Sequence, residues 1–466
     1  MRKFAIVFGH GIGEIQKRAI EELSRILLDY TLEYPICCEY REDESWCDYK
    51  RIYVGTRENH PYIEMHSSAH LTNAEEYHIK VEKDFAIIEG YDDAGVLYGA
   101  IDFYNKYIVK YEHPDTDRYW VNFLEQDELP SFAYSASPSV KERGLWTWGH
   151  VIYDYRGYID HMMRLKLNRL IIWNDFVPTN ARNIVEYAHA RNVKVIWGFS
   201  WLWDTSCGSV DLKKLEGCSE EILSKYESEY AGIGADGIYF QTFTELHEDN
   251  IGGVLIAKAA TDFVNRTAAL FYEKYPDLEL QFGLHATSVK DRLEFIKCVD
   301  PRIRIVWENC GSFPFSYIPG DVACFEETKR FVQSISQLRG AKDRFGAVTK
   351  GLVKLDWSSF EHQTGSQCIG ESSEQMKRNR VERKRRIWRY IQAGWLTYAD
   401  KAYQMVREMC RAKEGELSIY ALVEDGMFEE NVMYPVALYS EMLWNCENDV
   451  HDLMREVALR SDVVFA

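Results

Sequence analysis

Three acidic residues that follow short β-rich runs in the second part of the chain could do acid-base chemistry. Glu245 ends the run 236–245, Glu308 follows a Val-Trp pair, and Asp356 follows a Lys-Leu pair. Cleavage of a glycosidic bond needs one protonated carboxyl group that assists the departing oxygen. It also needs one ionised carboxylate that attacks, or that activates water or a substrate group. We therefore take these three residues as catalytic candidates for such a reaction.

Glu245 is our first choice for the catalytic acid. It ends the fourth of eight strands that we expect to form a barrel, and barrel glycosidases commonly place their acid at that position. A nearby apolar wall, such as Phe243 or Trp307, would raise its pKa and keep it protonated at neutral pH. The alternative interpretation is a salt-bridged glutamate on the rim of the barrel.

Two residues are candidates for the second, ionised carboxylate. Glu308 and Asp356 both lie at expected strand ends beside a tryptophan, and we rank Glu308 slightly ahead. Either residue could instead orient a substrate hydroxyl, or pair with Lys350, Lys354 or Arg143.

Aromatic and polar residues at the same strand ends are the expected substrate contacts. Most of the 13 tryptophans fall there, and the apolar face of a sugar packs flat on such rings. The predicted substrate-binding residues are Arg143, Trp146, Trp173, Asn174, Asp175, Trp201, Gln241, Thr244, His285, Trp307 and Trp357.

The net charge of the chain argues against nucleic acid as a partner. A net charge of −18 opposes binding to nucleic acid, which needs a basic field. One basic run, 377–389, lies within a helical pattern, and we interpret it as a solvated helix face or an oligomer contact.

The remaining composition indicates a cytoplasmic protein that needs no metal or cofactor. The 11 cysteines show no Cys-x-x-Cys pair, the 13 histidines form no ligand set, and His247, His285 and His362 fall on separate loops. The N-terminal apolar run is too short for a signal sequence. No stretch approaches 18 apolar residues, so we expect no membrane span.

Residues 131–466 are predicted to form a (β/α)₈ TIM barrel, because strand-like and helix-like segments alternate through them. Helices over 374–398 and 400–412 are expected as an insertion before the eighth strand, and more helices follow it. The expected strands cover 143–148, 169–173, 194–199, 237–240, 279–284, 304–307, 351–355 and 417–422.

Residues 1–130 are predicted to form a smaller α/β domain. Strands are expected at 4–8, 51–55, 76–81 and 86–90, and helices over 15–30 and from 93 to about 109. The spacing of Gly95 and Gly99 in the second helix indicates tight packing.

This layout resembles glycoside hydrolase families 20, 67 and 84, in which a zincin-like domain precedes the barrel. The resemblance rests on the segment around Gly95 and Gly99, on Arg143-Gly144, and on the step at 167–170. It implies that Arg143 grips hydroxyls of a terminal sugar, and hence exo action. The chain has no His-Glu-x-x-His, so the zincin-like label implies a fold and no metal.

The catalytic motif departs from family 20 at one position. Those β-hexosaminidases carry an Asp-Glu pair after the fourth strand, whereas this chain has Thr244-Glu245. A threonine cannot stabilise an oxazolinium charge as a carboxylate does, so another acid such as Asp175 would have to supply it.

The expected function is therefore an exo-acting glycosidase, similar to β-N-acetylhexosaminidases but of divergent specificity, that acts on an imported oligosaccharide or glycoconjugate. An inverting enzyme similar to the family 67 α-glucuronidases is the main alternative. A catalytically silent carbohydrate-binding relative is another, and a metal-dependent hydrolase ranks low. We also expect a homodimer, with the helices of 374–412 as an interface.

Overall fold

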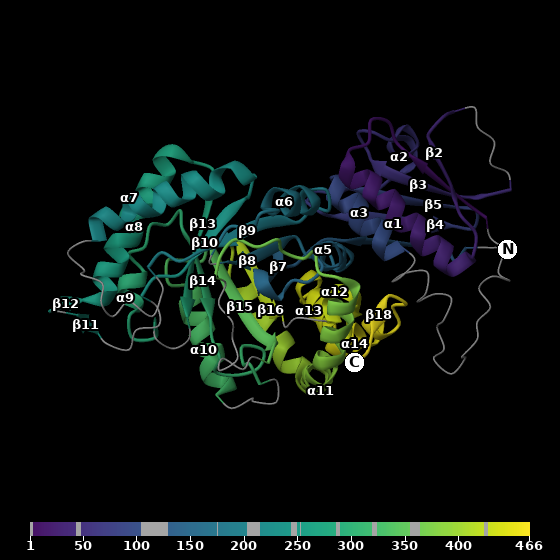
Figure 1. Ribbon diagram of the computed structural model, residues 1–466. Coiled ribbons are helices and arrows are strands. Elements are labelled where there is room, and N and C mark those ends of the chain that lie inside the picture. Colours follow the sequence, from purple (N-terminus) through teal and green to yellow (C-terminus); the bar gives the residue numbers. More distant parts are fainter. Residues whose placement is uncertain are drawn as a thin grey trace. The chain divides into compact units, whose positions relative to one another are not determined.

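The computed structural model describes residues 3–42, 48–103, 129–174, 176–202, 215–243, 249–251, 253–285, 289–318, 324–354, 364–423 and 427–466. The chain divides into two compact units (Figure 1). The first comprises residues 1–139, 190–192 and 451–463, and the second comprises 140–189, 193–450 and 464–466.

The first unit is built on a six-stranded sheet in the order β2-β1-β3-β5-β4-β6. The strands β2, β1, β3 and β5 are parallel, whereas β4 runs antiparallel to β5 and β6. The strands are β1 (Phe4–Phe8), β2 (Ile36–Glu39), β3 (Lys50–Thr56), β4 (Tyr77–Glu82), β5 (Phe85–Gly90) and β6 (Phe132–Ala136); the helices are α1 (Glu14–Thr31), α2 (Pro61–His66), α3 (Asp93–Asp102) and α14 (Val450–Ala458).

Two glycines let α3 pack closely on this sheet. A Cβ at Gly95 would lie 2.2 Å from the backbone oxygen of Glu76, and one at Gly99 would lie 2.8 Å from Ile88. Any side chain would push the helix away, which explains the glycine spacing seen in the sequence. The predicted α/β character of this region is confirmed, although β2, α2 and β6 were not foreseen.

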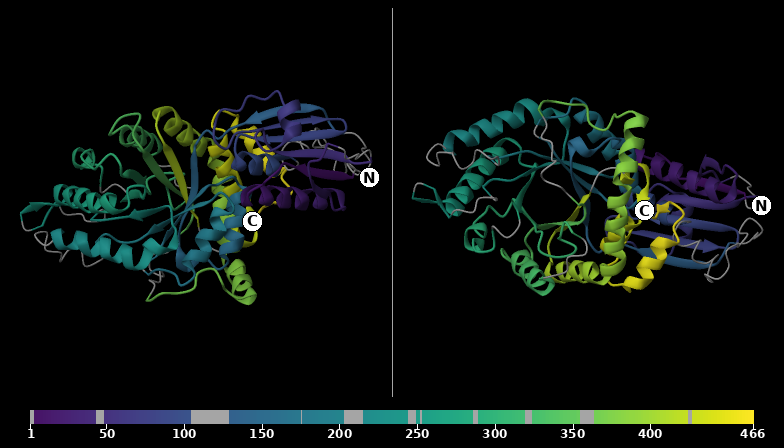
Figure 2. Two further views of the ribbon diagram at one scale, coloured as in Figure 1. Left: turned by 90° about the horizontal axis from the view of Figure 1, so that it is seen from above. Right: turned by 60° about the horizontal axis from the view of Figure 1, so that its bottom comes forward.

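The second unit is a closed barrel of eight parallel strands (Figure 2), as predicted. Each strand pairs with its neighbours in chain order, and β9 pairs with β10. The strands are β7 (Glu142–Trp148), β8 (Arg169–Trp173), β9 (Lys194–Gly198), β10 (Gly237–Phe240), β13 (Glu279–His285), β14 (Arg304–Glu308), β15 (Phe345–Leu352) and β16 (Leu417–Val423).

Helices follow the strands, as a (β/α)₈ barrel requires. Among the described residues, none of the helices has the length and apolar character needed to cross a membrane. The helical elements are η2 (Gly149–Val151), α5 (Tyr155–Arg164), α6 (Ala181–His189), α7 (Leu215–Lys225), η5 (Tyr226–Tyr230), η6 (Ala231–Ile233), α8 (Ile256–Lys274), α9 (Leu293–Ile296), α10 (Phe325–Ser336), α11 (Glu374–Ala412), α12 (Met427–Glu430) and α13 (Tyr434–Trp444). The short strands are β11 (Asn250–Ile251), β12 (Val254–Leu255), β17 (Val432–Met433) and β18 (Val463–Val464).

Two of these helices begin at side-chain caps. The Asp154 carboxylate accepts hydrogen bonds from the backbone N–H groups of Arg156 and Gly157 at the start of α5. The Ser373 hydroxyl accepts one from Met376 at the start of α11. Such caps satisfy N–H groups that lack a partner within the helix. α11 has non-helical backbone at Tyr398, which corresponds to the predicted break between two helices.

The seventh strand is the one that the sequence misplaced. It was predicted at 351–355, but β15 covers Phe345–Leu352. Gly346 and Lys350 interrupt the apolar pattern there, which hid the strand. Gly346 is required because a Cβ would lie 2.8 Å from the Ser418 hydroxyl.

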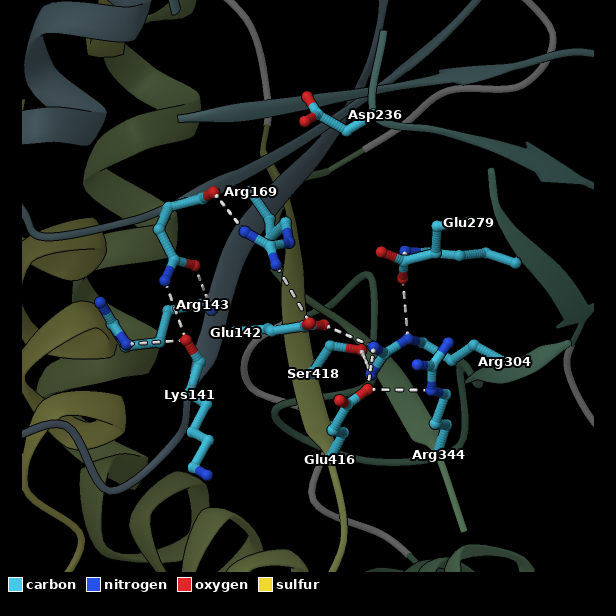
Figure 3. Close-up of polar contacts among 12 residues, drawn as sticks. Lys141, Glu142, Arg143, Arg169, Asp236, Glu279, Arg304, Arg344, Glu416 and Ser418 are labelled. Atoms are coloured by element: carbon cyan, nitrogen blue, oxygen red, sulfur yellow. Dashed lines mark hydrogen bonds and ion pairs between the residues drawn. The ribbon is translucent and has the colours of Figure 1, made fainter. Parts of the chain in front are cut away.

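An ionic network around the buried Arg304 lies at the N-terminal end of the barrel (Figure 3). The Arg304 guanidinium on β14 is 2.9 Å from Glu142, 3.0 Å from Glu279 and 3.2 Å from Glu416. Arg169 also pairs with Glu142, at 3.1 Å. The network joins β7, β8, β13 and β14 at the end opposite to that at which barrel enzymes do their chemistry.

Candidate active site

Glu308 ends β14 at the C-terminal mouth of the barrel, and its carboxylate is almost fully buried. Oε2 lies 2.8 Å from the Lys350 ammonium. Oε1 accepts hydrogen bonds from the Gln241 amide at 2.5 Å and from the Tyr239 hydroxyl at 3.1 Å. Three residues, from β15, from β10 and from the segment that follows β10, thus surround one carboxylate.

Lys350 on β15 is completely buried, and its ammonium has three polar neighbours. Besides Glu308, it donates to the Tyr317 hydroxyl at 2.8 Å and contacts the Cys310 sulfur at 3.6 Å. A buried ammonium must be paired to remain charged. Lys350 therefore holds Glu308 in one position and supplies the opposite charge.

This pairing decides the protonation state of Glu308. Burial by itself would raise the pKa of its carboxyl group, but Lys350 and then His285 act against burial, and the pKa ends below its usual value. Burial likewise opposes the charge on Lys350, yet Glu308 raises the pKa of the ammonium. Glu308 is therefore an ionised carboxylate at neutral pH, suited to attack or to accept a proton and unsuited to donate one.

Tryptophan side chains of β7 and β8 lie near the Glu308 carboxylate. Trp146 and Trp173 stack with ring centroids 6.3 Å apart. Both lie edge-on to the ring of Tyr239, at 5.9 and 6.1 Å, and Tyr239 donates to Glu308. Trp148 completes the cluster, 4.8 Å from Trp146. An apolar wall therefore adjoins an ionised group, as a sugar-binding pocket requires.

Asn174, which follows β8, is buried without satisfying its amide. Neither its Oδ1 nor its Nδ2 has a hydrogen-bond partner among the residues that the structure describes. Gly149 passes so close that a Cβ there would lie 1.9 Å from Oδ1. A buried amide without partners is costly, which is typical of a group reserved for a ligand.

Six predicted site residues lie at this mouth: Trp146, Trp173, Asn174, Gln241, His285 and Glu308. His285 is the neighbour of Glu308 in the pairing of β13 with β14, and Gln241 donates to its carboxylate. Lys350 was named from the sequence only as a possible ion-pair partner of Glu308, and the structure shows that pair. Tyr239 was not predicted, although both residues belong to the inward-facing series of their strands. That alternation was the signal that could have revealed them.

Three predicted substrate contacts lie elsewhere: Trp307, Trp201 and Arg143. Trp307 does so because successive residues of a strand face opposite sides. Trp307 is outside the barrel wall, where it contacts Phe315 and Phe331 at 5.1 Å each. Trp201 is also fully buried there, stacked 3.7 Å from Phe240. This placement argues against the predictions that Trp201 and Trp307 contact substrate.

Arg143 is the third correction. It lies at the N-terminal end of β7 and is fully buried. Its guanidinium donates to the backbone oxygens of Val140, Lys141 and Lys166 and lies over the Trp444 ring at 5.0 Å. Arg143 is therefore a packing residue at the end of β7 opposite to the candidate site. The exo action that the resemblance implied through Arg143 loses its support.

The remaining predicted residues lie outside the described part of the chain: Thr244, Glu245, Asp175, Asp356 and Trp357. Phe243, the last described residue before Glu245, has φ of 50°, a left-handed conformation that six other described non-glycine residues also adopt. The described residues include no group of three or more His, Cys, Asp or Glu side chains that could hold a metal ion.

Neither a protein family nor a curated protein matches the sequence. Three solved glycoside hydrolases resemble the structure. CpGH84B is 12% identical with a TM-score of 0.54, and the match covers 98% of this chain and 70% of that one. A GH138 enzyme that targets pectin rhamnogalacturonan II is 11% identical with a TM-score of 0.56, over 97% of this chain and 65% of that one. The family GH115 4-O-methyl-α-glucuronidase BtGH115A, specific for decorated arabinogalactans, is 13% identical with a TM-score of 0.51, over 98% of this chain and 59% of that one. The chain spans 59% to 70% of their lengths. At these identities the likeness shows the fold alone.

Proposed function

We propose that this protein is a glycoside hydrolase that uses Glu308 as its ionised carboxylate. The observation that carries the proposal is the buried Glu308–Lys350 pair beside the tryptophan cluster at the barrel mouth. The three structural neighbours, all of which are glycoside hydrolases with the same fold, add support.

In the proposed reaction, Glu245 gives its proton to the glycosidic oxygen while the bond to the anomeric carbon breaks. Glu308 either bonds to that carbon and is released by water, or takes a proton from the water that attacks it. Asp356 remains the alternative to Glu308 for this step. Trp146 and Trp173 pack against the sugar ring, while Gln241 and Asn174 bind its hydroxyls.

The substrate that we propose first is a β-N-acetylhexosaminide or a close analogue, as the sequence resemblance implies. An α-glucuronide is the second candidate, although Lys350 is already paired with Glu308 and does not offer its charge to a uronate. BtGH115A, an α-glucuronidase, shares the fold.

The test is turnover of a panel of p-nitrophenyl glycosides that includes α- and β-hexosides, N-acetylhexosaminides and glucuronides. We expect one glycoside to be cleaved, and we expect Glu308→Gln and Glu245→Gln each to lower kcat by about 10³-fold or more. Glu294→Gln, an exposed glutamate on α9, is the matched control and should retain full activity.

Loss of Glu308 also leaves Lys350 buried without its partner, so a folding defect must be separated from a chemical one. The double variant Glu308→Gln/Lys350→Met removes both charges, and its circular dichroism should match that of the native protein. Full turnover in a folded Glu308 variant would refute its catalytic role. Binding of glycosides without turnover would indicate a silent relative.

A further inference from the structure

Five arginines form one exposed face on the N-terminal half of α11. We define the arginine face as Arg378, Arg383, Arg385, Arg386 and Arg389, all of them exposed. The opposite side of the same helical turns is buried and includes Arg380, Val381, Trp388 and Ile391. The spacing of 3.6 residues per turn places the two sets on opposite sides, so the basic run is organised by the fold.

The positive charge of this face is not balanced locally. Among the described residues, none of the five arginines makes an ion pair with another side chain, and Glu382 is the only acid within the face. Arginines at positions 385 and 389, and at 386 and 389, are neighbours on the helix and repel each other. This concentration of charge stands out in a chain whose net charge is −18. An anionic ligand would relieve the repulsion.

The same stretch of α11 is anchored to loops at the barrel mouth. After β7, Arg380 donates to the backbone oxygen of Val151 and stacks 3.6 Å from the Tyr153 ring, while Lys377 is 2.8 Å from Asp154. After β15, Lys354 lies 4.6 Å from the ring of Tyr390.

Both loops follow the C-terminal ends of barrel strands, at which the candidate site lies. Farther along the helix, Trp395 Nε1 donates to the backbone oxygen of Gly351 at 2.9 Å. Contacts to two different strand ends fix the position of the helix. The segment of α11 that carries the arginine face is therefore held at the rim of the mouth near both of its ends.

We propose that the arginine face binds carboxylate or sulfate groups of an acidic glycan whose end enters the barrel mouth. The inference rests on the proposed function and specifies its substrate class. Guanidinium groups suit this task because they form paired hydrogen bonds with carboxylate and sulfate. Arg378, Arg385 and Arg389 lie on one stripe about 16 Å long, which suffices for several charged groups along a chain.

The test is the binding of a short oligogalacturonate, with a neutral malto-oligosaccharide of equal length as the reference ligand, by titration calorimetry. The native protein should bind the oligogalacturonate, more weakly as salt is added, and should bind the neutral chain far less. The variant Arg378→Gln/Arg385→Gln/Arg389→Gln should lose about tenfold or more in affinity and most of the salt dependence.

The control variant is Lys274→Gln/Lys297→Gln/Lys342→Gln, which removes the same charge from exposed lysines near the starts of β13, β14 and β15. It should bind as the native protein does. Equal loss in both variants would overturn the proposal, because it would show an effect of net charge alone. Absence of oligogalacturonate binding by the native protein would overturn it too.

Two further outcomes separate this inference from others. If no glycoside is turned over but the arginine variant alone loses oligogalacturonate binding, the catalytic proposal fails and the binding face stands. If the arginine variant changes the sedimentation of the protein and leaves glycan binding intact, the face is an interface between two copies of the chain, and the proposal is wrong.

Discussion

The ammonium of Lys350 lies 2.8 Å from the carboxylate of Glu308, on adjacent strands of the barrel, and both groups are buried. This pair sets the charge of the candidate site. It explains why the protein keeps a lysine inside a barrel that is otherwise lined there by tryptophan, tyrosine and valine.

Replacement of Lys350 by methionine should raise the pKa of Glu308, because burial would then act on a carboxylate that has lost its counter-charge. The acidic limb of the pH profile of kcat/KM should therefore move to higher pH. Lys350→Arg retains the charge and should move it less. An unchanged profile in folded Lys350→Met would show that Glu308 is not the group that titrates.

Asn174 should behave as a residue kept for function at the expense of stability. Asn174→Leu removes two buried polar atoms that have no described partner, so the free energy of unfolding should stay level or rise by about 1 kcal/mol. Turnover should fall about tenfold or more. Thermal melting and steady-state kinetics measure the two effects.

Asn168 is the matched control, since it is equally buried but satisfied. Its Oδ1 accepts from the Arg143 N–H, and its Nδ2 donates to the Lys141 oxygen. Asn168→Leu should therefore destabilise the protein by about 2 kcal/mol. Destabilisation of the same size in both variants would contradict a special role for Asn174.

Arg304→Met should destabilise the barrel strongly without changing substrate binding. It leaves Glu142 and Glu279 half-buried at the N-terminal end without Arg304 (Figure 3), although Arg169 still pairs with Glu142, and the cost should be about 3 kcal/mol. Urea unfolding measures this cost, and KM should not change. Arg344→Met removes only the half-exposed pair with Glu416, so a loss above about 1 kcal/mol would count against this account.

Glu429 on α12 should make stability depend on pH near neutrality. Burial raises the pKa of its carboxyl group to about 7, although Arg380 lies 3.7 Å away. The folded protein holds this proton up to about pH 7, whereas the unfolded chain releases it near pH 4.5. The stabilisation of the folded state by this proton is therefore complete below pH 4.5. As the pH rises from 4.5 to 7, the free energy of unfolding falls by roughly 3 kcal/mol.

Glu429→Gln should flatten this part of the stability curve, because glutamine carries no titrating proton and can still accept from the Tyr153 N–H. Denaturation at a series of pH values measures the slope. The exposed neighbour Glu430 provides the control, and Glu430→Gln should leave the slope as it is. A slope that persists in Glu429→Gln would assign it to another group.

The sequence by itself determined the architecture of this protein. Short β-rich runs alternate with helical segments, and this local pattern requires a parallel sheet whose faces are both covered. The same pattern placed Glu308 correctly at a strand end, because local hydrophobic runs mark where strands stop. It failed at β15, where Lys350 was taken as a residue that precedes a strand at 351–355, although it lies within the strand and Glu308 neutralises it inside the barrel.

Only the tertiary structure decided which strand-end residues share a site. Trp307 and Glu308 are adjacent in the chain, yet one faces α10 and the other faces the barrel interior. Arg143 and Trp146 lie on one strand, but at different heights and on opposite sides of it. A distance along the chain carries no information on pairing between strands, and the closure of the barrel is what brings β14 and β15 together to join Glu308 with Lys350.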